Sequence, residues 1–113
     1  MWERRQHKRV MVDRRAEIVL ADGAVLYGTA CDISRTGMAV KTDRRVEPGT
    51  LLDVSFNLSF QDQIKKFTAR CKAIYIGLIG DEEKFRLGLQ FVEMGTEEQE
   101  MLNAFLLYRL GRI

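Results

Sequence analysis

Residues 50–58, TLLDVSFNL, decide the fold class of this chain because apolar and polar side chains alternate along them. The apolar positions that set this alternation are Leu52, Val54, Phe56 and Leu58. A two-residue period is typical of an antiparallel strand that turns one face to the core and the other to water. The stretch therefore predicts a half-buried β-strand.

Segments on both sides of this stretch carry the same signal. Residues 66–76 alternate in the same way, with one apolar face made by Phe67, Ala69, Cys71 and Ala73. The turn residues at 21–23 predict a hairpin that joins a strand over 16–20 to one over 24–34. Further strands are expected over 38–42 and 85–92, and the remaining connections are a turn at 47–49 and a polar loop over 77–84.

The last segment changes to a helical period, and we expect a C-terminal helix over residues 96–110. Thr96 and Gln99 have the spacing of a capping box, in which each side chain bonds the other residue's backbone amide. An apolar stripe at helical spacing follows, made by Met101, Leu102, Phe105, Leu106 and Leu110. The sequence thus predicts a mainly β protein, a six-stranded antiparallel β-barrel with a C-terminal α-helix that covers an opening or an edge. A two-layer α+β sheet is the alternative.

The length of 113 residues suits one domain over residues 1–113. No apolar run reaches the ~20 residues that span a bilayer, and the start of the chain lacks the pattern of a secretory signal. The two cysteines, Cys31 and Cys71, are read as free thiols in a reducing compartment, and no His/Cys cluster suggests a metal. We therefore expect a cytoplasmic protein with no metal and no membrane span.

Positive charge is concentrated at the start of the chain. Residues 1–15 hold six Lys/Arg against two acidic residues, whereas the other 98 residues hold 12 against 14. A nucleic-acid-binding protein usually carries a basic face over its whole fold, so this local cluster suits a small anion better and no nucleic-acid partner is expected. The sequence also lacks a nucleophile beside a base and a phosphate-binding glycine loop, so we do not expect an enzyme.

The stretch DISRTG, residues 32–37, has a structural and a functional reading. Asp, Ser, Thr and Gly are ordinary turn residues, which is the structural reading. A carboxylate at Asp32 would also accept the N1–H and N2–H groups of guanine, and Ser34, two residues on, would share its face of a strand. Arginine complements the rest of guanine, because its planar fork pairs with O6 and N7, stacks on the ring and grips phosphate. A guanine nucleotide would therefore satisfy the arginines and this stretch together.

These residues resemble a known family. Arg5-x-x-x-Arg9, followed by Asp32-x-Ser34-x-x-Gly37, is similar to the paired motifs of the PilZ domain, the bacterial receptor module for cyclic di-GMP. Residues 86–91, RLGLQF, resemble the closing barrel strand of such domains. The resemblance covers essentially the whole chain. It implies a six-stranded antiparallel barrel with residues 1–10 as a flexible basic arm over its outer surface.

The resemblance also implies a ligand site. Arg5 and Arg9 would grip phosphate and stack on guanine, while Asp32 and Ser34 would bond a guanine edge. Gly37 would allow the tight turn that leaves the surface open.

In this family, an arginine at the position of Arg4 accompanies binding of two mutually intercalated cyclic di-GMP molecules. Tyr75 is a candidate for the aromatic platform that some members add from a late strand.

The implied function is a cyclic di-GMP receptor or adaptor that changes conformation on binding and signals to a partner protein in trans. Two alternatives are a PilZ-fold interaction module that does not use nucleotide, and a small basic barrel that binds nucleic acid.

Overall fold

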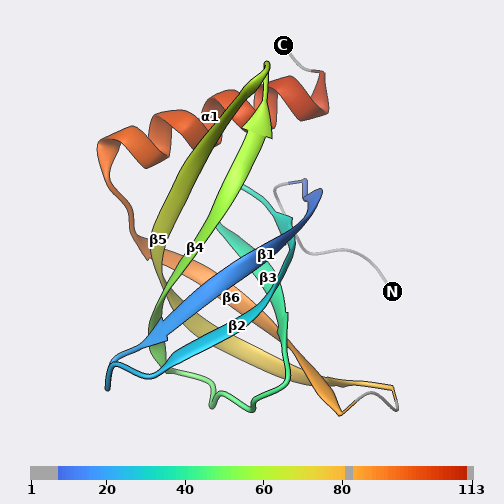
Figure 1. Ribbon diagram of the computed structural model, residues 1–113, viewed down its shortest axis with the longest axis vertical. Helices are drawn as coiled ribbons and strands as arrows, with labels where there is room; N and C mark the ends of the chain where they lie inside the picture. Colours follow the sequence, from blue (N-terminus) through green and yellow to red (C-terminus); the bar gives the residue numbers. More distant parts are fainter. Residues whose placement is uncertain (1–7, 81–82, 112–113) are drawn as a thin grey trace.

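The computed structural model describes residues 8–80 and 83–111, and within them the chain forms six strands and one helix (Figure 1). In chain order these are β1 (Val10–Leu20), β2 (Val25–Ile33), β3 (Gly37–Thr42), β4 (Leu51–Phe60), β5 (Gln63–Ile79), β6 (Lys84–Glu93) and α1 (Thr96–Leu110). The mainly β fold with a C-terminal helix is therefore confirmed.

The six strands form a closed barrel in the order β1-β2-β3-β6-β5-β4. Every neighbouring pair is antiparallel, and β4 pairs with β1 to close the ring. Two pairings, β1 with β4 and β3 with β6, join strands that are far apart in the sequence. The two-layer sheet is thus excluded, because a closed ring leaves no free edge.

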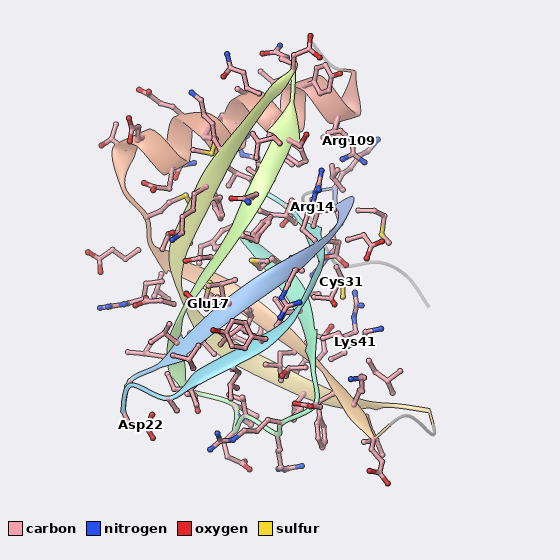
Figure 2. All side chains as sticks on the ribbon, in the orientation of Figure 1. Arg14, Glu17, Asp22, Cys31, Lys41 and Arg109 are labelled. Carbon is pink, nitrogen blue, oxygen red and sulfur yellow. The ribbon has the colours of Figure 1, made fainter. Side chains whose placement is uncertain are left out.

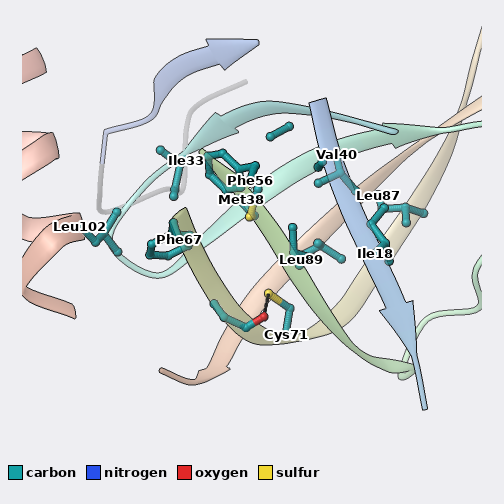
Figure 3. Packing of buried hydrophobic residues seen from close by; sticks show 14 of the residues in the cluster. Ile18, Ile33, Met38, Val40, Phe56, Phe67, Cys71, Leu87, Leu89 and Leu102 are labelled. Carbon is teal, nitrogen blue, oxygen red and sulfur yellow. Dashed lines mark hydrogen bonds between the residues drawn. The ribbon is translucent and has the colours of Figure 1, made fainter. Parts of the chain in front are cut away.

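The barrel interior is filled by the apolar faces that the alternation predicted. Within the β4–β5 hairpin, Leu52 lies opposite Cys71 and Phe56 lies opposite Phe67, and all four side chains are buried. Figure 3 shows Phe56, Phe67 and Cys71 in one core with side chains of the other strands, and Leu52 belongs to the same cluster. Each fully buried large aliphatic or aromatic side chain contributes roughly 1.5–3 kcal/mol of hydrophobic free energy, so this core holds the ring together.

Helix α1 lies across one end of the barrel (Figure 1) and closes it with Leu102, Phe105 and Leu106, which join the core. Leu110 continues the stripe in sequence but is 43% exposed, so the buried stripe ends one turn earlier. The predicted capping box is wrong. Gly95 is the N-cap and no side chain caps the helix, because Thr96 is already the first helical residue, one position too late to cap it.

Several strand boundaries also differ from the prediction. β5 continues to Ile79 and β6 begins at Lys84, so half of the expected loop over 77–84 belongs to a cross-strand ladder. β1 begins at Val10, the last residue of the expected arm, and passes through a bulge at Asp13, where φ is 49°. Charged residues and a glycine interrupt the apolar alternation along these extensions, so periodicity alone does not predict them.

Candidate functional site

Asp32 lies at the end of β2, on the outer wall that β2, β3 and β6 form. A regular strand would place Asp32 on the same face as Ala30, which is fully buried in the core. A bulge between Ala30 and Asp32 inserts Cys31 and reverses the alternation, so that Ile33 enters the core instead. The bulge therefore directs the Asp32 carboxylate to the outer wall.

The carboxylate of Asp32 binds two arginines. Arg9 Nη1 donates to Oδ1 over 2.8 Å, and Arg86 Nη2 donates to Oδ2 over 2.7 Å. The Asp32 side chain is only 6% exposed, against 27% for Arg9 and 40% for Arg86. A buried carboxylate is costly unless cations and hydrogen bonds compensate it, and here each oxygen has its own guanidinium. The cluster holds two positive charges against one negative, so it can attract a further anion.

Arg86 also interacts with Tyr75. Tyr75 lies opposite Gly88 in the β5–β6 ladder, and its ring occupies the space that a Cβ at Gly88 would need. Burial acts to lower the pKa of Arg86, but a hydrogen bond with Tyr75, the charge of Asp32 and the bond to Asp32 together raise it. The arrangement joins Tyr75, Arg86 and Asp32 in one chain of contacts across β5, β6 and β2.

Ser34 and Gly37 form the turn between β2 and β3. The Ser34 hydroxyl donates to the Gly37 carbonyl over 3.3 Å and accepts from the Thr36 amide over 3.3 Å, and the Ser34 amide donates to the same Gly37 carbonyl over 2.8 Å. A Cβ at Gly37 would collide with the Leu89 carbonyl of β6. The sequence reading assigned Gly37 to turn geometry, whereas the structure requires it for the close approach of β3 to β6.

The predicted site residues divide into three groups. Arg9 and Asp32, which the resemblance assigned to phosphate and to a guanine edge, are in direct contact with each other. Ser34 and Gly37, which are both buried, bond to each other across the turn. Arg4 and Arg5 lie outside the described residues.

Sequence reasoning missed Arg86 as a site residue. Its contact with Asp32 spans 54 positions and depends on the pairing of β3 with β6. The periodicity of the sequence predicts where the strands lie but not which strands pair with each other in the barrel.

Cys31 is the free thiol nearest to this cluster. Burial is the main cause that raises the pKa of the Cys31 thiol, while Arg86 and Lys41 act against it. Cys31 and Lys41 lie near each other on the same side of the barrel in Figure 2. Cys31 is therefore a natural reporter of events at Asp32.

The wall that β1, β2 and β4 form carries a shallow groove of about 400 Å³. Arg15 and Tyr27 line it, and the Arg15 guanidinium lies 5.5 Å from the centre of the Tyr27 ring. Arg15 is thus already engaged away from Asp32. In the described ranges, no cluster of three or more His, Cys, Asp or Glu side chains could hold a metal, and no helix is long and apolar enough to cross a membrane.

Comparison with known proteins identifies the family. The PilZ domain model matches residues 3–108, nearly the whole chain, so the chain belongs to the PilZ domain family. PilZ domains are generally non-catalytic receptor modules. No curated protein matches at a significant level of sequence similarity.

Three solved structures illustrate the shared fold. The PilZ domain of YcgR from Escherichia coli with c-di-GMP has a TM-score of 0.73 at 18% identity, covering 96% of this chain and 93% of that one. The inhibitor of motility MotI/DgrA of Bacillus subtilis has a TM-score of 0.79 at 18% identity over 97% of this chain. The MrkH–c-di-GMP complex of K. pneumonia has a TM-score of 0.76 at 20% identity over 94% of this chain. This chain spans about half of the last two, 53% and 51%.

Proposed function

We propose that this PilZ-domain protein is a receptor for cyclic di-GMP that changes conformation on binding and passes the signal to a partner protein. One observation carries the proposal: a single buried carboxylate, Asp32, is held at the outer wall between the guanidinium groups of Arg9 and Arg86. A carboxylate that accepts hydrogen bonds suits the N1–H and N2–H edge of guanine, and planar cations suit its ring and its phosphates.

The ligand contacts that we propose fall on three segments. Asp32 and Ser34 bond a guanine edge at the end of β2. Gly37 lets β3 lie close to β6, and this keeps Asp32 and Ser34 in place. Arg5 and Arg9, from the residues that precede β1, bind phosphate and stack on guanine. Support comes from the family and from two relatives of the same fold whose structures contain c-di-GMP.

Calorimetric titration of cyclic di-GMP into the purified chain tests the proposal. Cyclic di-AMP, single-stranded DNA and duplex DNA serve as controls. We expect saturable binding of cyclic di-GMP alone, together with a rise in melting temperature, because ligand at 100 times its dissociation constant adds roughly 2.7 kcal/mol to the folded state. A melting temperature that no nucleotide changes would instead favour an interaction module that does not use nucleotide.

We further propose that the ligand binds as two intercalated molecules and that Arg4 sets this number. A second molecule adds two phosphates and two ring faces, which need a further planar cation. Replacing Arg4 by Leu should move the calorimetric stoichiometry from about two toward one while weaker binding survives. A stoichiometry of one in the unchanged protein would refute the dimer and leave the receptor assignment standing.

The downstream partner is a protein that distinguishes the bound from the free state. Affinity capture of partners by the immobilised chain, with and without cyclic di-GMP, tests this point. We expect at least one protein whose recovery depends on the ligand and is lost with Asp32→Ala.

A further inference from the structure

We propose that Arg86 is a positioning residue for the guanine-binding carboxylate, and that Arg9 masks this carboxylate until the ligand displaces it. The inference rests on the proposed function, because it concerns how Asp32 becomes available to guanine. Nothing in the paired motifs includes Arg86, which comes from β6 rather than from the arm or the β2–β3 turn.

The first step is the state of the carboxylate in the ligand-free chain. Guanine presents N1–H and N2–H side by side, so it engages both oxygens of a carboxylate. Each oxygen of Asp32 already accepts one short bond, from Arg9 at 2.8 Å and from Arg86 at 2.7 Å. A carboxylate can accept more than two bonds, but this side chain is only 6% exposed. Both guanidinium groups therefore block the approach, and one of them must leave.

The second step decides which arginine leaves. Arg86 lies within β6 and is paired on both sides, with Lys41 of β3 and with Gly77 of β5. Its side chain also bonds Tyr75, whose ring packs over Gly88. Moving Arg86 would break its contacts with both Asp32 and Tyr75, so it is the fixed partner of Asp32.

Arg9 is held less completely than Arg86. It precedes the first paired residue of β1, Val10, so no ladder holds its backbone. Its Nε is buried, and among the described residues no atom accepts a hydrogen bond from it. A buried donor without an acceptor is unfavourable, so Arg9 can gain a bond when it leaves Asp32 for a phosphate oxygen.

The roles of the two arginines then differ in a measurable way. Arg9 exchanges the carboxylate for phosphate, whereas Arg86 remains as the counter-charge that orients the oxygens of Asp32 toward guanine. Loss of Arg86 should therefore weaken recognition of the base and act only through Asp32. A purely structural role would lower stability without changing the preference for guanine.

Calorimetry with cyclic di-GMP and four variants tests this. Arg86→Gln should bind about 10- to 100-fold more weakly than the parent, since it loses one charged hydrogen bond. Arg86→Lys should fall between them because it keeps the charge without the planar fork. Tyr75→Phe should lose only a few-fold. Arg70→Gln is the matched control, because Arg70 also bonds an aspartate, Asp53, across two strands, and it should bind like the parent.

A double-mutant cycle separates positioning from simple charge loss. Asp32→Asn with Arg86→Gln should bind no more weakly than Asp32→Asn alone, because Arg86 acts through Asp32. Cyclic di-inosine monophosphate lacks the guanine amino group, so the preference for cyclic di-GMP over it should shrink in Arg86→Gln and Arg86→Lys. Melting temperatures show whether each variant is folded.

The outcomes distinguish this inference from the function on which it rests. A parent that does not bind cyclic di-GMP overturns both. A parent that binds, with Arg86→Gln or Arg86→Lys binding equally well, overturns only the role of Arg86, as do additive losses in the cycle or an unchanged preference for guanine. Masking by Arg9 is tested by arginine side-chain NMR, where ligand should alter the Arg9 guanidinium signals and leave those of Arg86 bonded. The opposite pattern overturns the masking.

Discussion

Asp32 and Asp53 are both aspartates on the outside of the barrel, and both bond arginine, but they do so in opposite ways. Asp53 faces Arg70 directly across the β4–β5 hairpin, with Nε to Oδ1 at 3.0 Å, and both side chains are open to water, at 39% and 52% exposure. Asp32 is almost fully buried and binds one arginine from 23 residues before it and one from 54 residues after it.

The difference lies in what each pair requires of the fold. A hairpin ion pair such as Asp53–Arg70 forms from local pairing, and water competes for both charges, so it contributes little. The Asp32 pair needs a bulge at Cys31, the end of the arm and the pairing of β3 with β6. Burying a charge with so many partners is costly to arrange and costly to disturb, which favours a binding role over a structural one.

The largest expected contrast is between the two cysteines, Cys31 beside Asp32 and Cys71 behind the Asp53 wall. Burial raises the pKa of the Cys71 thiol to about 12, and the side chain is inaccessible in the core. Burial also raises the pKa of Cys31, but the side chain is partly exposed. At about pH 8, a thiol reagent such as DTNB should modify Cys71 far more slowly than Cys31, because the Cys71 side chain is inaccessible and its thiolate fraction is very small.

The ligand and the pH sharpen this contrast. Cyclic di-GMP should slow the modification of Cys31, and Cys31→Ser is the control that leaves only the slow reaction.

Because the folded pKa of Cys71 lies above its unfolded value of 9.0, its contribution to stability is complete below about pH 9. That contribution is lost as the pH rises toward 12, by up to roughly 1.4 kcal/mol per pH unit. Equal labelling rates would contradict the difference between the two sites.

The second contrast is between arginines on the two walls. Arg9→Ala should weaken cyclic di-GMP binding about 10- to 100-fold, because it removes a charged planar donor that binds the ligand. Arg15→Ala removes the same charge from a side chain that lies over Tyr27, and should change affinity less than about twofold at physiological salt. Calorimetry at one ionic strength checks both. If the two losses are equal, the arginines act only as a general positive field.

The sequence predicted strands more successfully than contacts between distant residues. The alternation over residues 50–58 and 66–76 predicted the two strands that carry Asp53 and Arg70, because the apolar pattern there is periodic. The paired motifs named Arg9 and Asp32 as ligand-binding residues but did not predict the contact between them. The contact of Arg86 with Asp32 could not be predicted, since it depends on strand order and on a one-residue bulge that reverses the faces of β2.

The third contrast is in the free energy of unfolding, measured by denaturant titration without ligand. Asp32→Asn should lower it by about 1–3 kcal/mol, because Arg9 and Arg86 lose their shared anion. The buried position of Asp32 and the partial burial of both arginines keep water from replacing it fully. Asp53→Asn should leave it close to the parent value, as is usual for exposed ion pairs. An Asp53→Asn variant as unstable as Asp32→Asn would mean that burial does not separate the two pairs.

The smallest expected effect is a change remote from both walls, at the start of α1. Gly95 is the N-cap without a side-chain cap, and Glu98 stands at the third helical position, where a capping box needs an acidic or amide side chain. A Cβ at Gly95 would approach only the flexible end of Glu98, at 2.7 Å, so Gly95→Ser can be accommodated and adds the missing hydroxyl. The gain over glycine at an N-cap is a few tenths of a kcal/mol.

Gly95→Ser should therefore raise the denaturation midpoint slightly and leave the affinity for cyclic di-GMP unchanged. Gly95→Ala is its matched control, because it adds the Cβ without the hydroxyl and should lower stability. This pair of variants tests whether a change in stability alone alters ligand affinity. The comparison of Asp32 with Asp53 assumes that it does not. If Gly95→Ser changed ligand affinity, helix α1 would be coupled to the Asp32 wall through the barrel, and the losses at Asp32 would no longer report on the site alone.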